Sequence, residues 1–158
     1  MLRTHRWQQA ERGQSLVEMS IGFIILTLIV MGILDLGRVY FLNLALEDAA
    51  GEAALYLSLN PYCPDASSGN HCSDPKNAKY RALHSGGANV DWSTAGFTYE
   101  YRNPGDGTWS QTIPNEVQSG MLVRVTIETE FQVLTPVISA ITRGQPITLS
   151  VFAVGTVV

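Results

Sequence analysis

The stretch that decides the fold is LVEMSIGFIILTLIVMGIL, residues 16–34. Fourteen of its nineteen residues carry large apolar side chains, and its one charged residue, Glu18, stands near its start. A helix of this length spans about 29 Å, which matches the hydrocarbon core of a bilayer at about 30 Å. Length and composition together predict a transmembrane helix over residues 14–38.

The charges that flank this segment predict how the chain is oriented in the membrane. Arg3, Arg6 and Arg12 precede it against a single glutamate, whereas residues 35–52 contain four acidic residues opposed only by Arg38. Cytoplasmic flanks of membrane helices carry the excess of Arg and Lys. We therefore expect the N-terminus in the cytoplasm and the rest of the chain, beyond the helix, outside the cytoplasm.

Two other interpretations of the apolar segment stay open. A buried core helix of a soluble protein would have to cover the sixteen uncharged residues 19–34 within a small domain. A cleavable secretory signal usually has an apolar region of only about 7–15 residues. The alanine-rich stretch 45–54 would then supply the small residues of its cleavage site.

The helix is expected to continue beyond the membrane over residues 39–59. The chain contains no proline before Pro61, and this stretch is rich in Ala and Leu, the best helix formers. Its apolar residues recur at spacings of three and four, which places them on one helical face. These residues are Leu42, Leu46, Ala49, Ala53 and Leu57.

Residues 60–158 are expected to form an α+β head, in which a small antiparallel β-sheet packs on the outer half of the long N-terminal helix. The clearest alternation lies in residues 121–131, where Val123, Val125 and Ile127 face one side. Residues 147–158 are apolar on both faces, which favours a central strand or one covered by a neighbour. The other expected elements are strands over 97–101 and 109–113, a short helix capped by Asp74 and ending near Ser85, and a short helix or turn over 136–141.

Both cysteines, Cys63 and Cys72, lie in a polar loop with three prolines, residues 60–75. Outside the cytoplasm, an even pair of cysteines in such a loop is typical of a disulfide. Two metal sites are weaker alternatives, because neither matches a known ligand spacing. They are a zinc site from Cys63, His71, Cys72 and His84, and a calcium site from Asp65, Asn70 and Asp74.

Charge and motif content exclude several classes of function. The chain has 10 basic and 14 acidic residues, a net charge of −4, and no basic run. Duplex binding rests on neutralising phosphates, so a nucleic-acid partner is not expected. No hydrolase, metalloprotease, P-loop or dinucleotide-binding motif occurs in the sequence. We therefore expect no catalytic residue, no cofactor and no bound metal.

The residues at the start of the apolar segment resemble a type IV prepilin cleavage site. The motif is RGQSLVE, residues 12–18, and it follows a short basic leader. The resemblance implies that Gly13 precedes the scissile bond, that Gln14 becomes the first residue of the mature chain, and that Glu18 becomes its fifth. Residues 1–13 would then be a cleaved leader.

The match extends to a pattern similar to the TadE family, the pseudopilins or minor pilins of the tight adherence pilus. It comprises GILDLGR at residues 32–38 and AAGEAA at 49–54, with VRVTI at 123–127, LTPVI at 134–138 and ITLSV at 147–151. Two features depart from the family pattern. The apolar span has no proline, and Val133 replaces the first proline of the turn.

The resemblance implies a function in assembling such a pilus, with several partners. These are a prepilin peptidase, other pilin or pseudopilin subunits, an inner-membrane assembly platform and the lipid bilayer. The protein would be a single-pass membrane protein that enters an extracellular pilus after processing. The alternative function is an uncleaved, single-span anchor for an extracytoplasmic binding module.

Glu18 is a charged residue inside an apolar segment, which is energetically unfavourable unless its carboxylate has a partner or reaches water. A carboxylate costs about 2.5–3.5 kcal/mol at the bilayer centre, and less near its edge. One interpretation is that Glu18 lies at the headgroup level. The resemblance implies another, in which Glu18 pairs with the free N-terminal amine of a neighbouring subunit and fixes the axial register of the assembly.

Asp35 and Arg38 share a helical face at a spacing of three residues near the outer end of the span. A local ion pair is one interpretation. The other is an intersubunit pair that sets packing in an assembly.

Overall fold

The structure is a computed structural model that describes residues 5–86, 90–105 and 107–158. Arg3 of the expected leader lies outside the described residues. The chain divides into two compact units, each described here by itself. The first comprises residues 1–38 and 133–145, and the second comprises residues 39–132 and 146–158.

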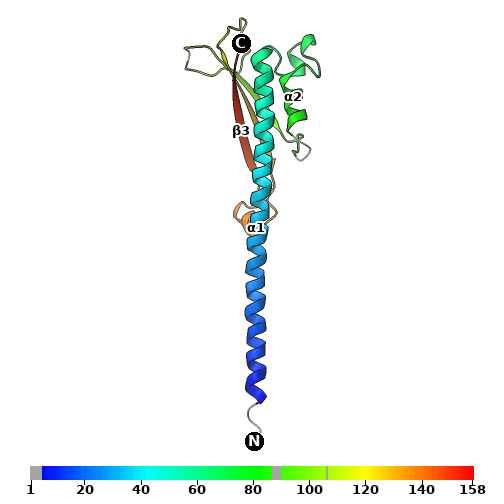
Figure 1. The fold of residues 1–158 in the computed structure, drawn as a ribbon, viewed down its shortest axis with the longest axis vertical. Coiled ribbons are helices and arrows are strands. Elements are labelled where there is room, and N and C mark those ends of the chain that lie inside the picture. Colours follow the sequence, from blue (N-terminus) through cyan, green and yellow to red (C-terminus); the bar gives the residue numbers. More distant parts are fainter. Residues whose placement is uncertain (1–4, 87–89, 106) are drawn as a thin grey trace. The chain divides into compact units, whose positions relative to one another are not determined.

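A single helix, α1 (His5–Leu59), forms the N-terminal part of the chain (Figure 1). The predicted continuation of the apolar helix through residues 39–59 is confirmed. Because α1 is continuous, it does not mark the predicted boundaries at residues 13 and 38. Those boundaries stay predictions.

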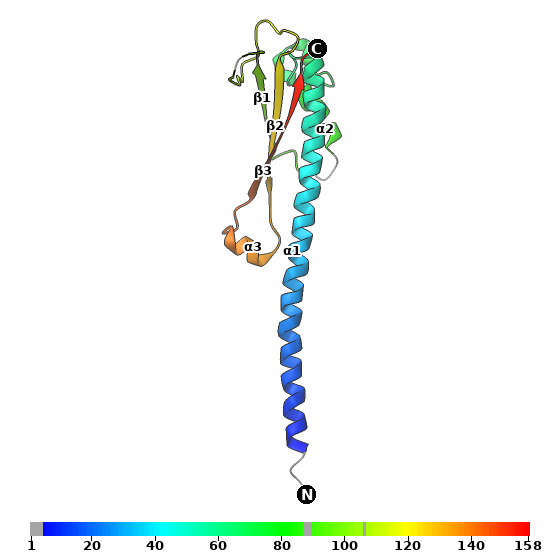
Figure 2. The ribbon, with the colours of Figure 1, turned by 60° about the vertical axis from the view of Figure 1, so that its left-hand side comes forward.

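The second unit contains a three-stranded antiparallel sheet in the order β1-β2-β3 (Figure 2). Its strands are β1 (Gly96–Arg102), β2 (Leu122–Phe131) and β3 (Ile147–Thr156). The predicted α+β class, a long helix packed on a small antiparallel sheet, is confirmed.

Two strand predictions need correction. β3 is an edge strand rather than a central one, because β2 pairs on both sides. The alternative, a strand covered by a neighbour, holds on the face where Gly155 meets α1. Residues 109–113 contribute only an isolated bridge from Ser110 to Tyr101. The ladder ends there because the Ser110 hydroxyl accepts from the backbone N–H of Thr112 at 3.2 Å, which turns the chain.

The core lies where the outer part of α1 packs on β2. The α1 residues Leu46, Ala53 and Leu57 are buried, as the helical spacing predicted. They meet the inward face of β2, which includes Val123 and Val125. The predicted inner face of β2 is therefore confirmed.

β3 approaches α1 closely at Gly155. A Cβ atom at this position would lie 2.7 Å from the carbonyl oxygen of Ala54 in α1. Because that oxygen belongs to the helix backbone, it cannot move aside as a flexible side chain would. Gly155 therefore allows a helix–sheet distance that any larger residue would prevent.

The short helix α2 (Ala78–Ser85) begins later than predicted. Its N-cap is Asn77, whose side-chain oxygen accepts from the backbone N–H of Tyr80 at 2.7 Å. Asp74 is not the cap. Its carboxylate accepts from the side-chain amide of Asn77 at 2.7 Å and so orients the residue that caps α2.

Candidate functional site

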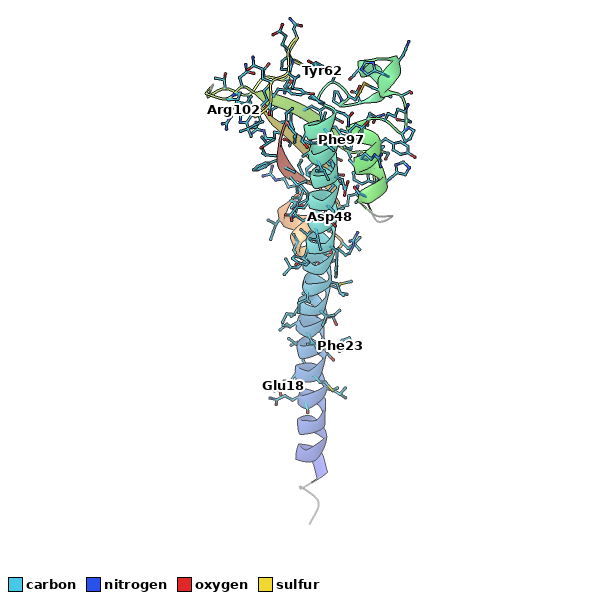
Figure 3. The ribbon with its side chains drawn as sticks, turned by 45° about the horizontal axis from the view of Figure 1, so that its top comes forward. Glu18, Phe23, Asp48, Tyr62, Phe97 and Arg102 are labelled. Atoms are coloured by element: carbon cyan, nitrogen blue, oxygen red, sulfur yellow. A yellow bond between two sulfur atoms is a disulfide. The ribbon has the colours of Figure 1, made fainter. Side chains whose placement is uncertain are left out.

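The predicted processing segment, Gly13 to Glu18, lies on an exposed part of α1. A Cβ atom at Gly13 would have no atom within 4 Å outside its own stretch of helix. The Glu18 side chain projects from α1, and Phe23 projects from the next turns (Figure 3). The peptide bond after Gly13 is accessible, but it is held in helical geometry.

Gln14 and Glu18 are connected directly. The side-chain amide of Gln14 donates to the Glu18 carboxylate at 3.0 Å, across one helical turn. The two residues therefore lie on the same face of α1. Pairing of Glu18 with the amine of a neighbouring subunit stays a prediction, because it requires a second chain.

Asp35 lies at the centre of a polar cluster in the first unit. The residue is 5% exposed. It accepts from the backbone N–H groups of Leu134 at 3.1 Å and Thr135 at 2.7 Å, and from the Thr135 hydroxyl at 2.5 Å. Arg38 lies one turn further along α1, with its guanidinium 3.4 Å from the same carboxylate.

Sequence reasoning placed Asp35 beside Arg38, and this local ion pair is present. An intersubunit role for the two residues stays a prediction. The contact of Asp35 with Leu134 and Thr135, about a hundred residues away, was missed. Both partners lie in motifs quoted from the sequence, GILDLGR and LTPVI, but neither motif indicates that they meet.

The start of α3 explains why the N–H group of Thr135 is free to donate to the Asp35 carboxylate. Thr135 is the N-cap residue of the short helix α3 (Pro136–Ile141), and Pro136 keeps it extended. The Thr135 side chain makes no capping bond to α3. Its hydroxyl and its backbone N–H both donate to Asp35 instead. Asp35 thus satisfies donors that the start of α3 leaves open.

Cys63 and Cys72 form a disulfide in the second unit. It encloses two short 3-10 helices, Ala66–Ser68 and Asn70–Cys72. One ring nitrogen of His71 lies within 4.8 Å of both sulfur atoms. Because those sulfurs are bonded to each other, they do not provide the thiolate ligands of the alternative zinc site.

The carboxylates of the alternative calcium site have partners within the chain. Asp65 caps the first 3-10 helix and accepts from the N–H of Ser67 at 2.9 Å and the hydroxyl of Ser68 at 3.0 Å. Burial alone would raise the pKa of Asp65, but these hydrogen bonds outweigh it and lower the pKa below its usual value. Asp74 is held by Asn77.

The aromatic side chains of the head divide between the core and the surface. Trp92 stacks on Phe97 beside the core, and the hydroxyl of Tyr101 donates to the carbonyl of Pro61 at 2.9 Å. Burial raises the pKa of Tyr101 to about 12. These groups serve packing rather than proton transfer.

Trp109 behaves differently, because it lies over the sheet face that points away from the core. The guanidinium of Arg102 is 4.9 Å from its ring centre, and that of Arg124 is 4.3 Å away. Arg124 also pairs with Glu100 at 2.6 Å. The arrangement stabilises the outer face of β1 and β2 by cation–π contacts.

Comparison with known proteins gave one result. The family model of the TadE-like proteins matches residues 13–55. This match covers most of α1, including Gly13, Glu18, Asp35 and Arg38. Comparisons with curated proteins and with solved structures gave no match.

One helical segment among the described residues, Gly13–Leu59, is long and apolar enough to cross a membrane. Its most apolar window has a mean hydropathy of 2.4, and none of that window is buried within the chain.

Proposed function

We propose that the chain is a pseudopilin or minor pilin of a tight adherence pilus, because the TadE-like family model matches residues 13–55 and that family consists of pilus components. In this proposal a prepilin peptidase cleaves it after Gly13, and the mature chain takes part in pilus assembly. The observation that carries the proposal is the Gly13–Glu18 motif at the exposed start of an apolar helix within the matched segment.

The proposed arrangement places α1 across the inner membrane. Residues 1–13 lie in the cytoplasm, residues 14–38 cross the bilayer, and residues 39–158 lie outside the cytoplasm. The exposed apolar side chains of residues 16–34 support this arrangement, because lipid would cover them. The disulfide also supports it, because such bonds persist in oxidising compartments.

Cleavage requires the backbone around the scissile bond to leave the helix. The peptidase hydrolyses the Gly13–Gln14 peptide bond with one water, leaving a carboxylate on Gly13 and a free amine on Gln14. A glycine in a helix is less stable than an alanine by about 1 kcal/mol. Gly13 therefore lowers the cost of unwinding the helix at the point where the enzyme must bind an extended chain.

Assembly would use the amine that cleavage creates. Gln14 and Glu18 lie on one face of α1, so each subunit presents an amine and a carboxylate about one helical turn apart. A neighbour shifted along the helix axis then meets the carboxylate with its own amine. In a low-dielectric setting this pairing stabilises both charges and fixes the axial register.

The proposal is tested by the mass of the protein after expression with a prepilin peptidase. We expect the wild-type chain to begin at Gln14 and the Gly13→Glu variant to remain at full length, because a bulky charged side chain blocks the site before the cut. Gln8→Glu is the matched control, since it adds the same charge to the leader away from the cut. Processed Gly13→Glu protein, or a wild-type chain that still begins at Met1, would overturn the site assignment.

A further inference from the structure

Residues 133–145, which we call the α3 turn, form an exposed apolar element of the first unit. Leu134 is 66% exposed and Ile141 is 76% exposed. The sequence of the turn, VLTPVISAITRGQ, contains no acidic residue and one basic residue, Arg143. In a chain with a net charge of −4, this segment is locally positive.

Hydrogen bonds to Asp35 hold the start of the α3 turn against α1. Asp35 accepts from both backbone N–H groups at the start of the turn and from the Thr135 hydroxyl. Asp35 is also the first charged residue after the sixteen uncharged residues 19–34. The turn is therefore bonded to α1 at the residue that ends its uncharged stretch. Figure 2 shows α3 beside α1.

Two basic side chains belong to this region, one on α1 and one in the α3 turn. Arg38 follows Asp35 by one helical turn, and half of its side chain is exposed. Arg143 is exposed and follows the C-cap of α3 in the left-handed conformation, with a φ of 56°. Long basic side chains beside an apolar surface are typical of elements that lie in a membrane interface.

We propose that the α3 turn is a second membrane-contacting element, which inserts Leu134 and Ile141 into the outer leaflet while Arg38 and Arg143 contact the phosphates of the lipid headgroups. Its partner is the bilayer, because the turn is hydrogen-bonded to the membrane end of α1 through Asp35, and its basic side chain complements the lipid phosphates. The inference rests on the membrane-spanning part of the proposed function. It does not depend on cleavage or on pilus assembly.

The test compares three single-cysteine variants of the full chain in phosphatidylcholine vesicles, each labelled with the same environment-sensitive dye. Ile141→Cys reports on the α3 turn, and Ile25→Cys reports on the span. Phe152→Cys is the matched control on β3, because Phe152 is 66% exposed but shares its sheet face with Glu128 and Glu130. Cys63 and Cys72 stay oxidised, so only the introduced thiol reacts.

Lipids that carry a quencher near the headgroup or near the chain end measure the depth of each dye. We expect the shallow quencher to act on Ile141→Cys, the deep quencher to act on Ile25→Cys, and neither to act on Phe152→Cys. An unquenched Ile141→Cys beside a quenched Ile25→Cys overturns the inference and leaves the membrane span intact. An unquenched Ile25→Cys overturns the span itself. Equal quenching of Ile141→Cys and Phe152→Cys overturns the inference, because contact would then not be particular to the turn.

Discussion

At the scale of single residues, two carboxylates of α1 have opposite surroundings. Asp35 is buried and accepts from two backbone N–H groups, a hydroxyl and a guanidinium. Glu18 is exposed and has the Gln14 side chain as a partner within the chain. Asp35 therefore has its observed partners within the chain, whereas the partner that Glu18 is proposed to have lies on a neighbouring subunit.

Removing the Asp35 carboxylate should release the α3 turn. In Asp35→Ala, the N–H groups of Leu134 and Thr135 lose their acceptor, and their amide hydrogens should exchange with solvent faster than in the wild type. Hydrogen exchange resolved at these residues measures the effect. Asp48→Ala is the control, because Asp48 is an exposed α1 carboxylate. Unchanged exchange at both amides in Asp35→Ala would show that the turn is held by other contacts.

Replacing the Glu18 carboxylate should separate processing from assembly. Glu18→Gln keeps the shape of the side chain and removes its charge, which leaves the amine of a neighbour unpaired. Breaking one side of a buried ion pair costs about 3–5 kcal/mol, enough to abolish a weak assembly. We expect mature-length protein in the membrane, with piliation and crosslinking to other subunits lost.

Glu47→Gln is the matched control for Glu18, since it neutralises an exposed α1 carboxylate outside the proposed membrane span. Piliation should be normal in that variant. Normal piliation in Glu18→Gln would instead place Glu18 at the headgroup level, with no role between subunits.

At the scale of elements, the head depends on the close approach of β3 to α1. The inward residues of the C-terminal half of β3 include Ala153 and Gly155, and both are small. The facing part of α1 is also lined by small residues, including Ala50 and Ala54. Small side chains on both elements let the backbones come close together. The distance between β3 and α1 therefore depends on side-chain volume as well as on apolar character.

A side chain at Gly155 should therefore destabilise the head. In Gly155→Val, the added Cβ atom meets the Ala54 carbonyl oxygen, and we expect overpacking to lower the free energy of unfolding by about 1–3 kcal/mol. Denaturant unfolding of the full chain in detergent measures the change. Gly96→Val in β1 is the matched control, because a Cβ atom there meets nothing within 4 Å. Equal stability of the two variants would contradict the close packing.

At the scale of the whole molecule, charge and the disulfide support the orientation proposed for the chain in the membrane. The residues before the span carry three arginines against one glutamate, and the second unit carries the disulfide. A mature chain that begins at Gln14 has 7 basic and 13 acidic residues, a net charge of −6. Such a chain is repelled by polyanions, which is consistent with a head that assembles with proteins.

Labelling with a membrane-impermeant maleimide should report this topology in spheroplasts. We expect Phe152→Cys to react at once, and Gln8→Cys of the unprocessed chain to react only after the membrane is permeabilised. Wild-type protein should not react without reduction, because Cys63 and Cys72 are bonded to each other. Labelling of Gln8→Cys in intact spheroplasts would reverse the proposed orientation.

The sequence by itself determined the features that depend on local periodicity and composition. The long apolar run and the helical spacing of Leu46, Ala53 and Leu57 predicted α1 and its buried face. The alternation around Val123 predicted the inner face of β2. Each of these signals is local, because the period of a helix or strand decides which side chains share a face, whatever that face packs against.

Only the tertiary structure decided which segments meet. It placed β3 at the sheet edge, although its apolar residues had left a central strand and one covered by a neighbour both open, because strand order depends on pairing with β2 rather than on composition. It also joined Asp35 to Thr135. The sequence showed a carboxylate and a turn with open donors, but their contact arises from folding of the intervening chain, which no local pattern records.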